Sequence, residues 1–211
     1  MTADPDVDAE LGDRLVAAVL ADPMCRAILD RMPALGVPQW WLTAGAVFQN
    51  AWNAVCSLPP GFGVLDYDVF YFDVDTSWDA EDRVIRRTES ALDDVLGDAL
   101  AGVVGERGAR VEVRNQARVH LWYEERFGVP AAPFGSATDG IDAFPSTTCC
   151  VALTRDGTDA SGPLRLYAPY GLADVFGMRM RPNRRLAPRA VYDDKVRSYQ
   201  QRWPALTADP W

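Results

Sequence analysis

Two aspartates lie two residues apart in a segment whose other residues are typical of a buried β-strand. Asp66 and Asp68 are followed by the β-forming run Val-Phe-Tyr-Phe at residues 69–72. Because successive side chains of a strand point to opposite faces, the two carboxylates share one face, about 6.6 Å apart along the strand. One or two carboxylates, with substrate phosphate and water, commonly bind magnesium. The segment therefore predicts a metal site, and the alternative is a solvated strand end in an acidic chain.

A third carboxylate, Glu112, stands between two valines in the alternating segment 110–114, which we predict to be another strand. If this strand lies beside the first, Glu112 joins Asp66 and Asp68 at the same edge of a sheet. Three anions that converge in this way would require cations. The alternative is an edge strand on which Glu112 faces solvent.

Gly45 opens a predicted helix over residues 44–56, immediately upstream of the aspartate pair. The first N–H groups of a helix have no partner within the helix and carry partial positive charge, so they bind phosphate well. Glycine also lets a phosphate approach the backbone closely. A glycine before a helix is more often a simple turn, so its position next to the aspartates is what supports a phosphate site.

Composition bounds the class of protein. The chain has 211 residues, of which 48% are hydrophobic and 24% charged, as in ordinary globular proteins. Its net charge of −9 argues against a broad nucleic-acid footprint, which needs clustered cations. The first residues lack the features of a signal peptide, and no apolar run approaches the length of a membrane span, so we expect a cytoplasmic protein. The single histidine, His120, excludes a histidine-rich metal centre.

Helices and strands are predicted to alternate, which favours a mixed α/β or α+β domain with a central mixed sheet flanked by helices. We expect an N-terminal helical segment, residues 1–38, to contact a main domain, residues 39–211, as one compact unit with a C-terminal helix. The predicted helices cover residues 7–21, 22–32, 44–56, 76–100, 115–123, 136–144 and 189–203. The predicted strands cover 65–73, 110–114, 149–153 and 164–167, and residues 40–43 are compatible with a strand or with the end of a helix.

Together these elements resemble the nucleotidyltransferase fold of the DNA polymerase β-like superfamily. A glycine-led helix, Asp-x-Asp in an apolar strand and an acidic residue on a later strand are common to that superfamily. Over residues 25–206 the chain is similar to a family of small bacterial nucleotidyltransferase-like proteins of unassigned substrate. The stretches that carry this closer resemblance are residues 41–46, 66–73, 113–120 and 168–174, of which Asn-Gln-Ala-Arg and Ala-Pro-Tyr-Gly-Leu are specific to the family.

The resemblance implies transfer of a nucleoside monophosphate from a nucleoside triphosphate to an acceptor, with release of pyrophosphate. Asp66 and Asp68 would bind the metal of the triphosphate, and Glu112 would complete a second metal site and help activate the acceptor hydroxyl. The expected cation is Mg²⁺, with Mn²⁺ as the alternative. The acceptor, whether small molecule, protein or RNA, is not defined by the sequence. The superfamily usually has glycine or serine after the glycine, whereas Ala46 follows Gly45 here.

We assign nucleotide contacts to residues on the glycine-led helix and to arginines that follow Glu112. These candidates are Gly45, Ala46, Asn50, Arg114 and Arg118. Arginine binds phosphate bidentately, and the alternative for both arginines is capping and surface pairing with carboxylates. Two other functions stay open: a nucleotide-binding regulatory or interaction protein without turnover, and a metal-dependent phosphohydrolase that uses the same carboxylates.

Two further features have no assigned function. His120 is interpreted as a packed structural histidine, and the basic segment at residues 179–185 as a solvated loop. A phosphate-bearing acceptor that docks on this segment is the alternative.

Overall fold

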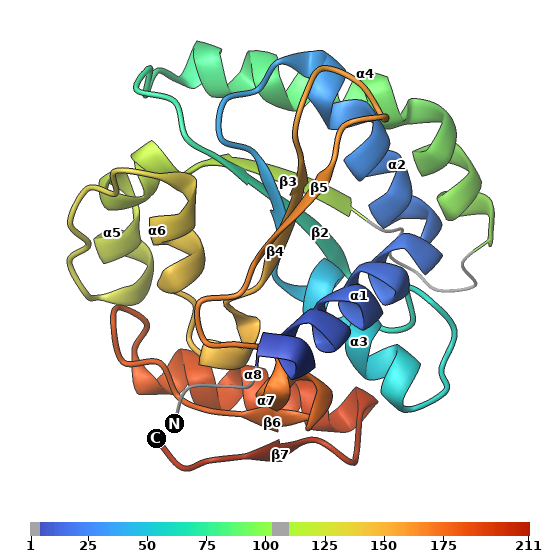
Figure 1. Cartoon of the computed structure of the whole chain (residues 1–211). Helices are drawn as coiled ribbons and strands as arrows, with labels where there is room; N and C mark the ends of the chain where they lie inside the picture. The colour runs from blue at the N-terminus through green and yellow to red at the C-terminus, as the bar shows by residue number, and fades with distance from the viewer. Residues whose placement is uncertain (1–4, 103–109) are drawn as a thin grey trace.

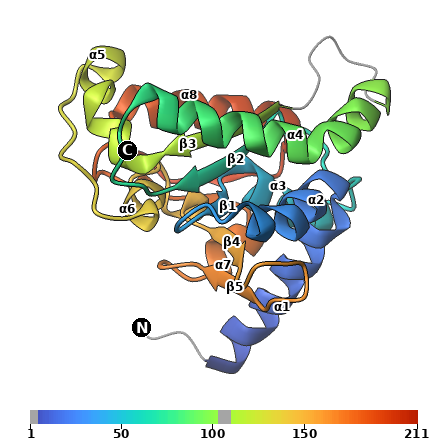
Figure 2. The ribbon, with the colours of Figure 1, turned by 90° about the horizontal axis from the view of Figure 1, so that it is seen from above.

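A computed structural model describes residues 5–102 and 110–211 of the chain. In these residues the largest sheet has five strands in the order β3-β2-β1-β4-β5 (Figures 1 and 2). Its strands are β1 (Trp41–Thr43), β2 (Asp66–Tyr71), β3 (Arg110–Asn115), β4 (Ala152–Arg155) and β5 (Leu164–Tyr167). Strands β2 and β3 are parallel, and the other neighbours are antiparallel. The fold class predicted from the sequence, a mixed sheet with flanking helices, is confirmed.

Helices surround this sheet (Figure 1). In Figure 1 the helices α5 and α6 lie on one side of the strands, α1 and α2 on the other, and α8 lies below. The helices are α1 (Pro5–Ala21), α2 (Pro23–Arg31), η1 (Met32–Leu35), α3 (Gly45–Val55), α4 (Trp78–Gly102), η2 (Gln116–Leu121), α5 (Tyr123–Phe127), α6 (Ala137–Asp142), η3 (Thr147–Cys149), α7 (Ala173–Phe176) and α8 (Arg189–Arg202). Two short strands, β6 (Arg179–Met180) and β7 (Thr207–Ala208), pair in parallel.

Strand β2, next to the centre of the sheet, has one face towards the core and one towards the site. Tyr67, Val69 and Tyr71 are buried, whereas the residues between them are only partly covered. Because alternate side chains of a strand face opposite sides of the sheet, Asp66 and Asp68 lie on the face away from the main core. The composition of the strand thus produces one apolar face and one face that carries carboxylates.

The main hydrophobic core includes side chains from both ends of the chain. Leu15 of α1 and Ile28 of α2 are fully buried in the same cluster as Val69 of the sheet and Leu206 near the C-terminus. The burial of this apolar surface is the main force that fixes the helices on the sheet. The helices α1 and α2 therefore share their core with the rest of the described chain.

A buried polar network connects α2, α3 and β2. Asp22, the residue before Pro23, is the N-cap of α2 and accepts hydrogen bonds from the backbone N–H groups of Met24 and Cys25. Its carboxylate also accepts hydrogen bonds from Asn50 Nδ2 and from the Tyr67 hydroxyl, each at 3.0 Å. A buried carboxylate needs such donors, because an unpaired buried charge is costly.

The sequence does not predict the short elements η1, α7, β6 and β7, and two predicted elements have other bounds in the structure. The strand expected at residues 149–153 begins only at Ala152, because Ser146 caps the short helix η3 that precedes it. The helix expected at residues 115–123 divides into η2 and α5, with Asn115 as the N-cap of η2. Side-chain caps decide both boundaries, and periodicity does not resolve them.

None of the helices in the described part of the chain combines the length and the hydrophobicity that crossing a bilayer requires.

The basic segment that contains β6 is largely neutralised by aspartates. Arg179 pairs with Asp209, and Arg181 pairs with Asp174. These ion pairs favour a structural function of the segment over a phosphate site.

Candidate active site

Asp68 and Glu112 occupy facing positions on the parallel strands β2 and β3. The register pairs Asp66 with Arg110 and Asp68 with Glu112. Paired residues of neighbouring parallel strands point to the same face of the sheet, so all three predicted carboxylates lie on one face. Strand β3 is an edge strand, as in the alternative of a solvent-facing Glu112, but the Glu112 side chain is only 20% exposed and lies on the same face as the aspartates.

Two arginines compensate part of this negative charge. Arg110 forms ion pairs with Asp66, at 3.3 Å, and with Glu112. Arg114 pairs with Glu112 at 3.4 Å. Among the described residues, the Asp68 carboxylate has no ion-pair partner. Of the three carboxylates, Asp68 is thus the one whose negative charge is not compensated by an ion pair.

The environment of Asp68 opposes its ionisation. Burial raises the pKa of the Asp68 carboxyl to about 6, the nearby Asp66 carboxylate adds to this shift, and the charge of Lys195 opposes it. A carboxyl group with a raised pKa beside a cavity is characteristic of sites that bind cations or transfer protons. Binding of a cation to Asp68 would favour the ionised form.

Two cavities meet at Asp68. The larger has a volume of about 480 Å³ and extends from Asp68 to Glu112 and on towards η2 and α5. The smaller has a volume of about 210 Å³ and extends from Asp68 to Asp66 and the start of α3 at Gly45. Glu112 lines only the larger cavity, Asp66 and Gly45 line only the smaller one, and Asp68 and Lys195 line both.

The smaller cavity is built around the N-terminus of α3. Ala44, the N-cap residue, has φ 56° and ψ −138°, a conformation that costs a non-glycine residue about 1–3 kcal/mol. A Cβ atom on Gly45 would lie 2.6 Å from Gln49 Nε2, so the glycine allows Gln49 to fold over the helix end. Gln49 is 5% exposed, and its Oε1 atom has no hydrogen-bond partner within the described structure. This oxygen is an acceptor, so it suits a hydrogen-bond donor or a cation next to the N-terminus of α3.

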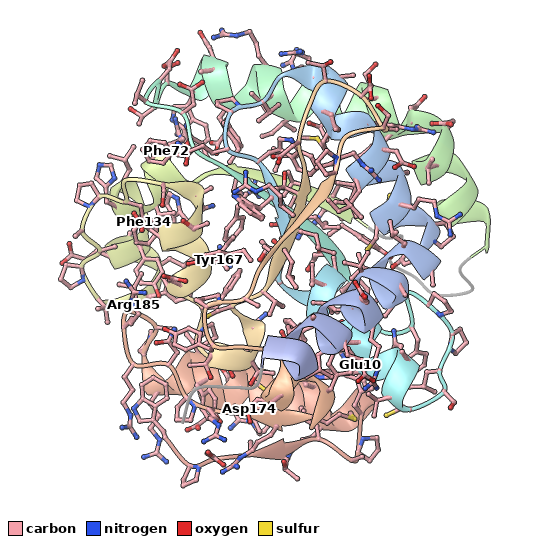
Figure 3. All side chains as sticks on the ribbon, in the orientation of Figure 1. Glu10, Phe72, Phe134, Tyr167, Asp174 and Arg185 are labelled. Carbon is pink, nitrogen blue, oxygen red and sulfur yellow. The ribbon has the colours of Figure 1, made fainter. Side chains whose placement is uncertain are left out.

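Aromatic and charged side chains both line the larger cavity. Its aromatic lining comes from β2, the start of α4, the segment 122–127, the loop before α6 and the residues after α6: Phe70, Trp78, Trp122, Tyr123, Phe127, Phe134 and Phe144. Figure 3 shows Phe134 beside α5 and α6, on the side of the molecule away from α1 and α2. The charged lining residues are Asp68, Glu81, Glu112, Arg114, Arg118, Arg126 and Lys195. A cavity that combines apolar walls with polar groups is typical of small-molecule sites.

Of the predicted nucleotide contacts on α3, only Gly45 lines a cavity. Ala46 is fully buried, and its carbonyl oxygen accepts a hydrogen bond from Asn50 Nδ2 at 2.8 Å. Asn50 also donates to Asp22 and accepts from the Gly61 N–H at 2.8 Å, so its amide is saturated inside the core. The sequence interpretation of Asn50 as a nucleotide contact is therefore replaced by a structural function. The reason is that Asn50 points towards Asp22 and away from the helix mouth.

The two predicted arginines differ from each other. Arg114 is half-exposed and lines the larger cavity, where it pairs with Glu112. Arg118 also lines this cavity, but its side chain is only 6% exposed and forms an ion pair with Glu81 at 3.0 Å. Its guanidinium stacks on the ring of Trp78 at 4.3 Å. The charge of Arg118 is thus already neutralised, which favours a positioning function over direct phosphate binding.

Lys195 of α8 is a site residue that the sequence interpretation does not include. It lines both cavities beside Asp68 and, among the described residues, forms no ion pair with a carboxylate. The sequence does contain one indication of Lys195: it is the single lysine of a chain whose other basic residues, apart from His120, are arginines. His120, by contrast, lines neither cavity.

The donor atoms present suit a hard cation. In the part of the chain that the structure describes, no three Asp, Glu, His or Cys side chains form a metal-binding group, because Arg110 lies between Asp66 and Glu112. The predicted three-carboxylate cluster is therefore not formed. Asp66 and Asp68 remain on one face, and Mg²⁺ can be bound by one or two carboxylates when phosphate and water complete its coordination. The uncompensated Asp68 makes this set fit Mg²⁺.

Comparison with known proteins places this geometry in a family. A family profile described as nucleotidyltransferase matches residues 30–208, which include every site residue named above. The chain belongs to this nucleotidyltransferase family. Asp66, Asp68, Glu112 and Lys195 are accordingly residues of a nucleotidyltransferase domain.

A solved structure has the same fold. It is an NMR structure described as a CCA-adding enzyme head domain, with 22% sequence identity and a TM-score of 0.68. The match covers 95% of this nucleotidyltransferase and 96% of that chain. A search of curated proteins gives no match. The nucleotidyltransferase fold therefore extends over nearly the whole chain, N-terminal helices included.

Proposed function

We propose that this chain is a metal-dependent nucleotidyltransferase that transfers a nucleoside monophosphate from a nucleoside triphosphate to an acceptor hydroxyl. The observation that supports this most strongly is the pairing of Asp68 with Glu112 at the junction of two cavities. A phosphoryl-transfer site needs a place for the leaving group, a place for the acceptor and carboxylates between them. The profile match and the described neighbour, a CCA-adding enzyme head domain, support the same reaction class.

The smaller cavity is suited to the β- and γ-phosphates. The N-terminus of α3 offers backbone N–H groups at Gly45, and Lys195 offers a positive charge. Helix N-termini and ammonium groups both attract phosphate. Asp66 and Asp68 would hold Mg²⁺ at the mouth of this cavity. A Mg²⁺ ion bound there would neutralise negative charge on the phosphate oxygens.

The reaction is a single in-line displacement. The oxygen of the acceptor hydroxyl forms a bond to the α-phosphorus, and the bond from that phosphorus to the α,β-bridging oxygen breaks, so that pyrophosphate leaves. Glu112 accepts the proton of the hydroxyl, and Arg110 and Arg114 hold its carboxylate in place. The products are a phosphodiester or phosphate ester of the acceptor and pyrophosphate.

Radiolabelled nucleoside triphosphates separate the three candidate activities. The protein is incubated with α-labelled triphosphate, Mg²⁺ or Mn²⁺, and a pool of small molecules, with an EDTA-treated sample as control. Pyrophosphate release with label transfer supports the proposal, and its loss in EDTA shows the metal requirement. Orthophosphate release would indicate a phosphohydrolase, and binding without turnover a regulatory protein. Either of these results contradicts the proposal.

Asp68→Asn and Asp66→Asn are the matched variants for this experiment. Each removes one carboxylate charge and keeps the size of the side chain. We expect both to lose Mg²⁺-dependent triphosphate binding, measured by calorimetry, while circular dichroism shows a folded protein. Unchanged Mg²⁺-dependent binding in both variants would reject the assignment of these residues.

A further inference from the structure

The two cavities extend from Asp68 in different directions. The smaller is bounded by α3, the start of β2 and α8, and the larger by β3, η2 and α5. In an in-line displacement, the attacking oxygen and the leaving oxygen lie on opposite sides of the phosphorus. If pyrophosphate leaves on the Gly45 side, the acceptor must enter from the Glu112 side. Glu112 lines the larger cavity and not the smaller one.

The walls of the larger cavity define the chemistry of what it can hold. Phe70, Trp122, Phe134 and Phe144 provide flat apolar surfaces, and Arg126 lies over the rings of Trp122 and Phe127 at 5.9 Å and 5.3 Å. Aromatic faces and stacked guanidinium groups bind other aromatic rings. A volume of about 480 Å³ lies in the range of small-molecule pockets.

Two arginines that are close in sequence to lining residues of the larger cavity are paired with aspartates, which argues against binding of a polynucleotide. Arg185, which Figure 3 shows on the same side of the molecule as Phe134, pairs with Asp142 at 2.8 Å. Arg189 at the start of α8 pairs with Asp193 at 3.0 Å. The chain as a whole has a net charge of −9. RNA binding depends on a run of uncompensated cations along the strand, and these pairs do not provide one.

We propose that the larger cavity is the acceptor site and that the acceptor is a small molecule with an aromatic ring and a hydroxyl group. The ring stacks between the aromatic walls, and the hydroxyl reaches Glu112. This inference rests on the proposed function for the direction of attack. The aromatic lining of the cavity is an independent observation.

The test uses one variant that fills the cavity and one that empties it. Ala143 lines the larger cavity and not the smaller one, so Ala143→Leu fills part of its volume. Trp122→Ala removes an aromatic wall. Ala190, an exposed residue of α8 that lines neither cavity, provides the matched control Ala190→Leu. Circular dichroism of all three proteins shows whether they are folded.

The probes are adenosine and 4-hydroxyphenylethanol, which carry a ring and a hydroxyl, glucose, which carries only hydroxyls, and a short RNA. Their binding to the full-length protein is measured by saturation-transfer NMR and tryptophan fluorescence, with and without saturating Mg²⁺ and α,β-methylene-ATP. We expect at least one aromatic probe to bind in both conditions, and glucose to bind more weakly. Ala143→Leu and Trp122→Ala should weaken that binding about tenfold, and Ala190→Leu less than about twofold.

Several results would overturn the inference. These are absence of binding by both aromatic probes, equal binding of glucose, tighter binding of the RNA, or binding that the two cavity variants leave unchanged. Displacement of the aromatic probes by α,β-methylene-ATP would assign the cavity to the nucleoside instead. Failure of the analogue to bind at all would count against the proposed function alone. The two proposals can therefore fail separately.

Discussion

Asp68 on β2 and Glu112 on β3 face each other across neighbouring parallel strands, yet they line different sets of cavities. Asp68 borders both cavities, and Glu112 borders only the larger one. Asp68 lacks an ion-pair partner within the described residues, whereas Glu112 is held by Arg110 and Arg114. The two carboxylates should therefore have separable effects on binding and on chemistry.

Glu112→Gln should lower kcat about 100-fold or more, because the amide cannot accept the proton of the acceptor hydroxyl. Nucleotide affinity should change less than about threefold, since Glu112 does not line the smaller cavity. Steady-state kinetics and calorimetry measure the two quantities. Glu124→Gln, at an exposed residue that lines neither cavity, is the control. A large loss of nucleotide affinity with unchanged kcat would contradict this assignment.

Asp68 should make stability depend on pH. Its pKa is raised from 3.8 to about 6 in the folded protein, so folding favours the protonated carboxyl. The stability that this provides is fully present below about pH 4 and is lost as the pH rises through about 6. Asp68→Asn should therefore raise the free energy of unfolding by about 2 kcal/mol near pH 8 and by almost nothing near pH 4. The value at pH 8 is smaller than the pKa shift alone gives, because solvent in the two cavities screens the charge of Asp68. Urea unfolding at both pH values measures this difference, and equal differences at both would contradict it.

Lys195→Ala should weaken binding of Mg²⁺–triphosphate about 10- to 100-fold, because it removes a cation that lines both cavities. Lys195→Arg should recover part of the affinity, since the charge is kept. Calorimetric titration gives the dissociation constants. Arg197→Ala, which removes an exposed arginine that pairs with Asp194, is the control and should have no effect. If both alanine variants bind equally well, Lys195 has no part in the site.

Asn50→Ala should lower the stability of the fold and leave nucleotide affinity intact. The substitution removes hydrogen bonds to Asp22, to the Ala46 carbonyl and from the Gly61 N–H, all inside the core. Loss of such buried bonds costs about 2–4 kcal/mol. Thermal or urea unfolding measures the loss, with the exposed Gln201→Ala as control. A tenfold loss of affinity in a protein of normal stability would restore Asn50 as a nucleotide contact.

Local patterns in the sequence determined the strand and helix starts around the site and the face on which its two aspartates lie. Alternation in β2 places Asp66 and Asp68 on one face, and this depends only on the geometry of a strand. Asp22 followed by proline defines the start of α2, and Gly45 opens α3, because caps and helix starts are set by neighbours in sequence.

Only the tertiary structure decided which residues meet. The register that sets Glu112 against Asp68 depends on a parallel pairing with the long helix α4 between the two strands, and local sequence does not specify it. Lys195 reaches Asp68 because α8 returns to the sheet from the far end of the chain, and Asn50 is turned into the core by Asp22. Side-chain direction and long-range packing arise from burial of the whole core, so they follow from the complete fold and not from any one segment.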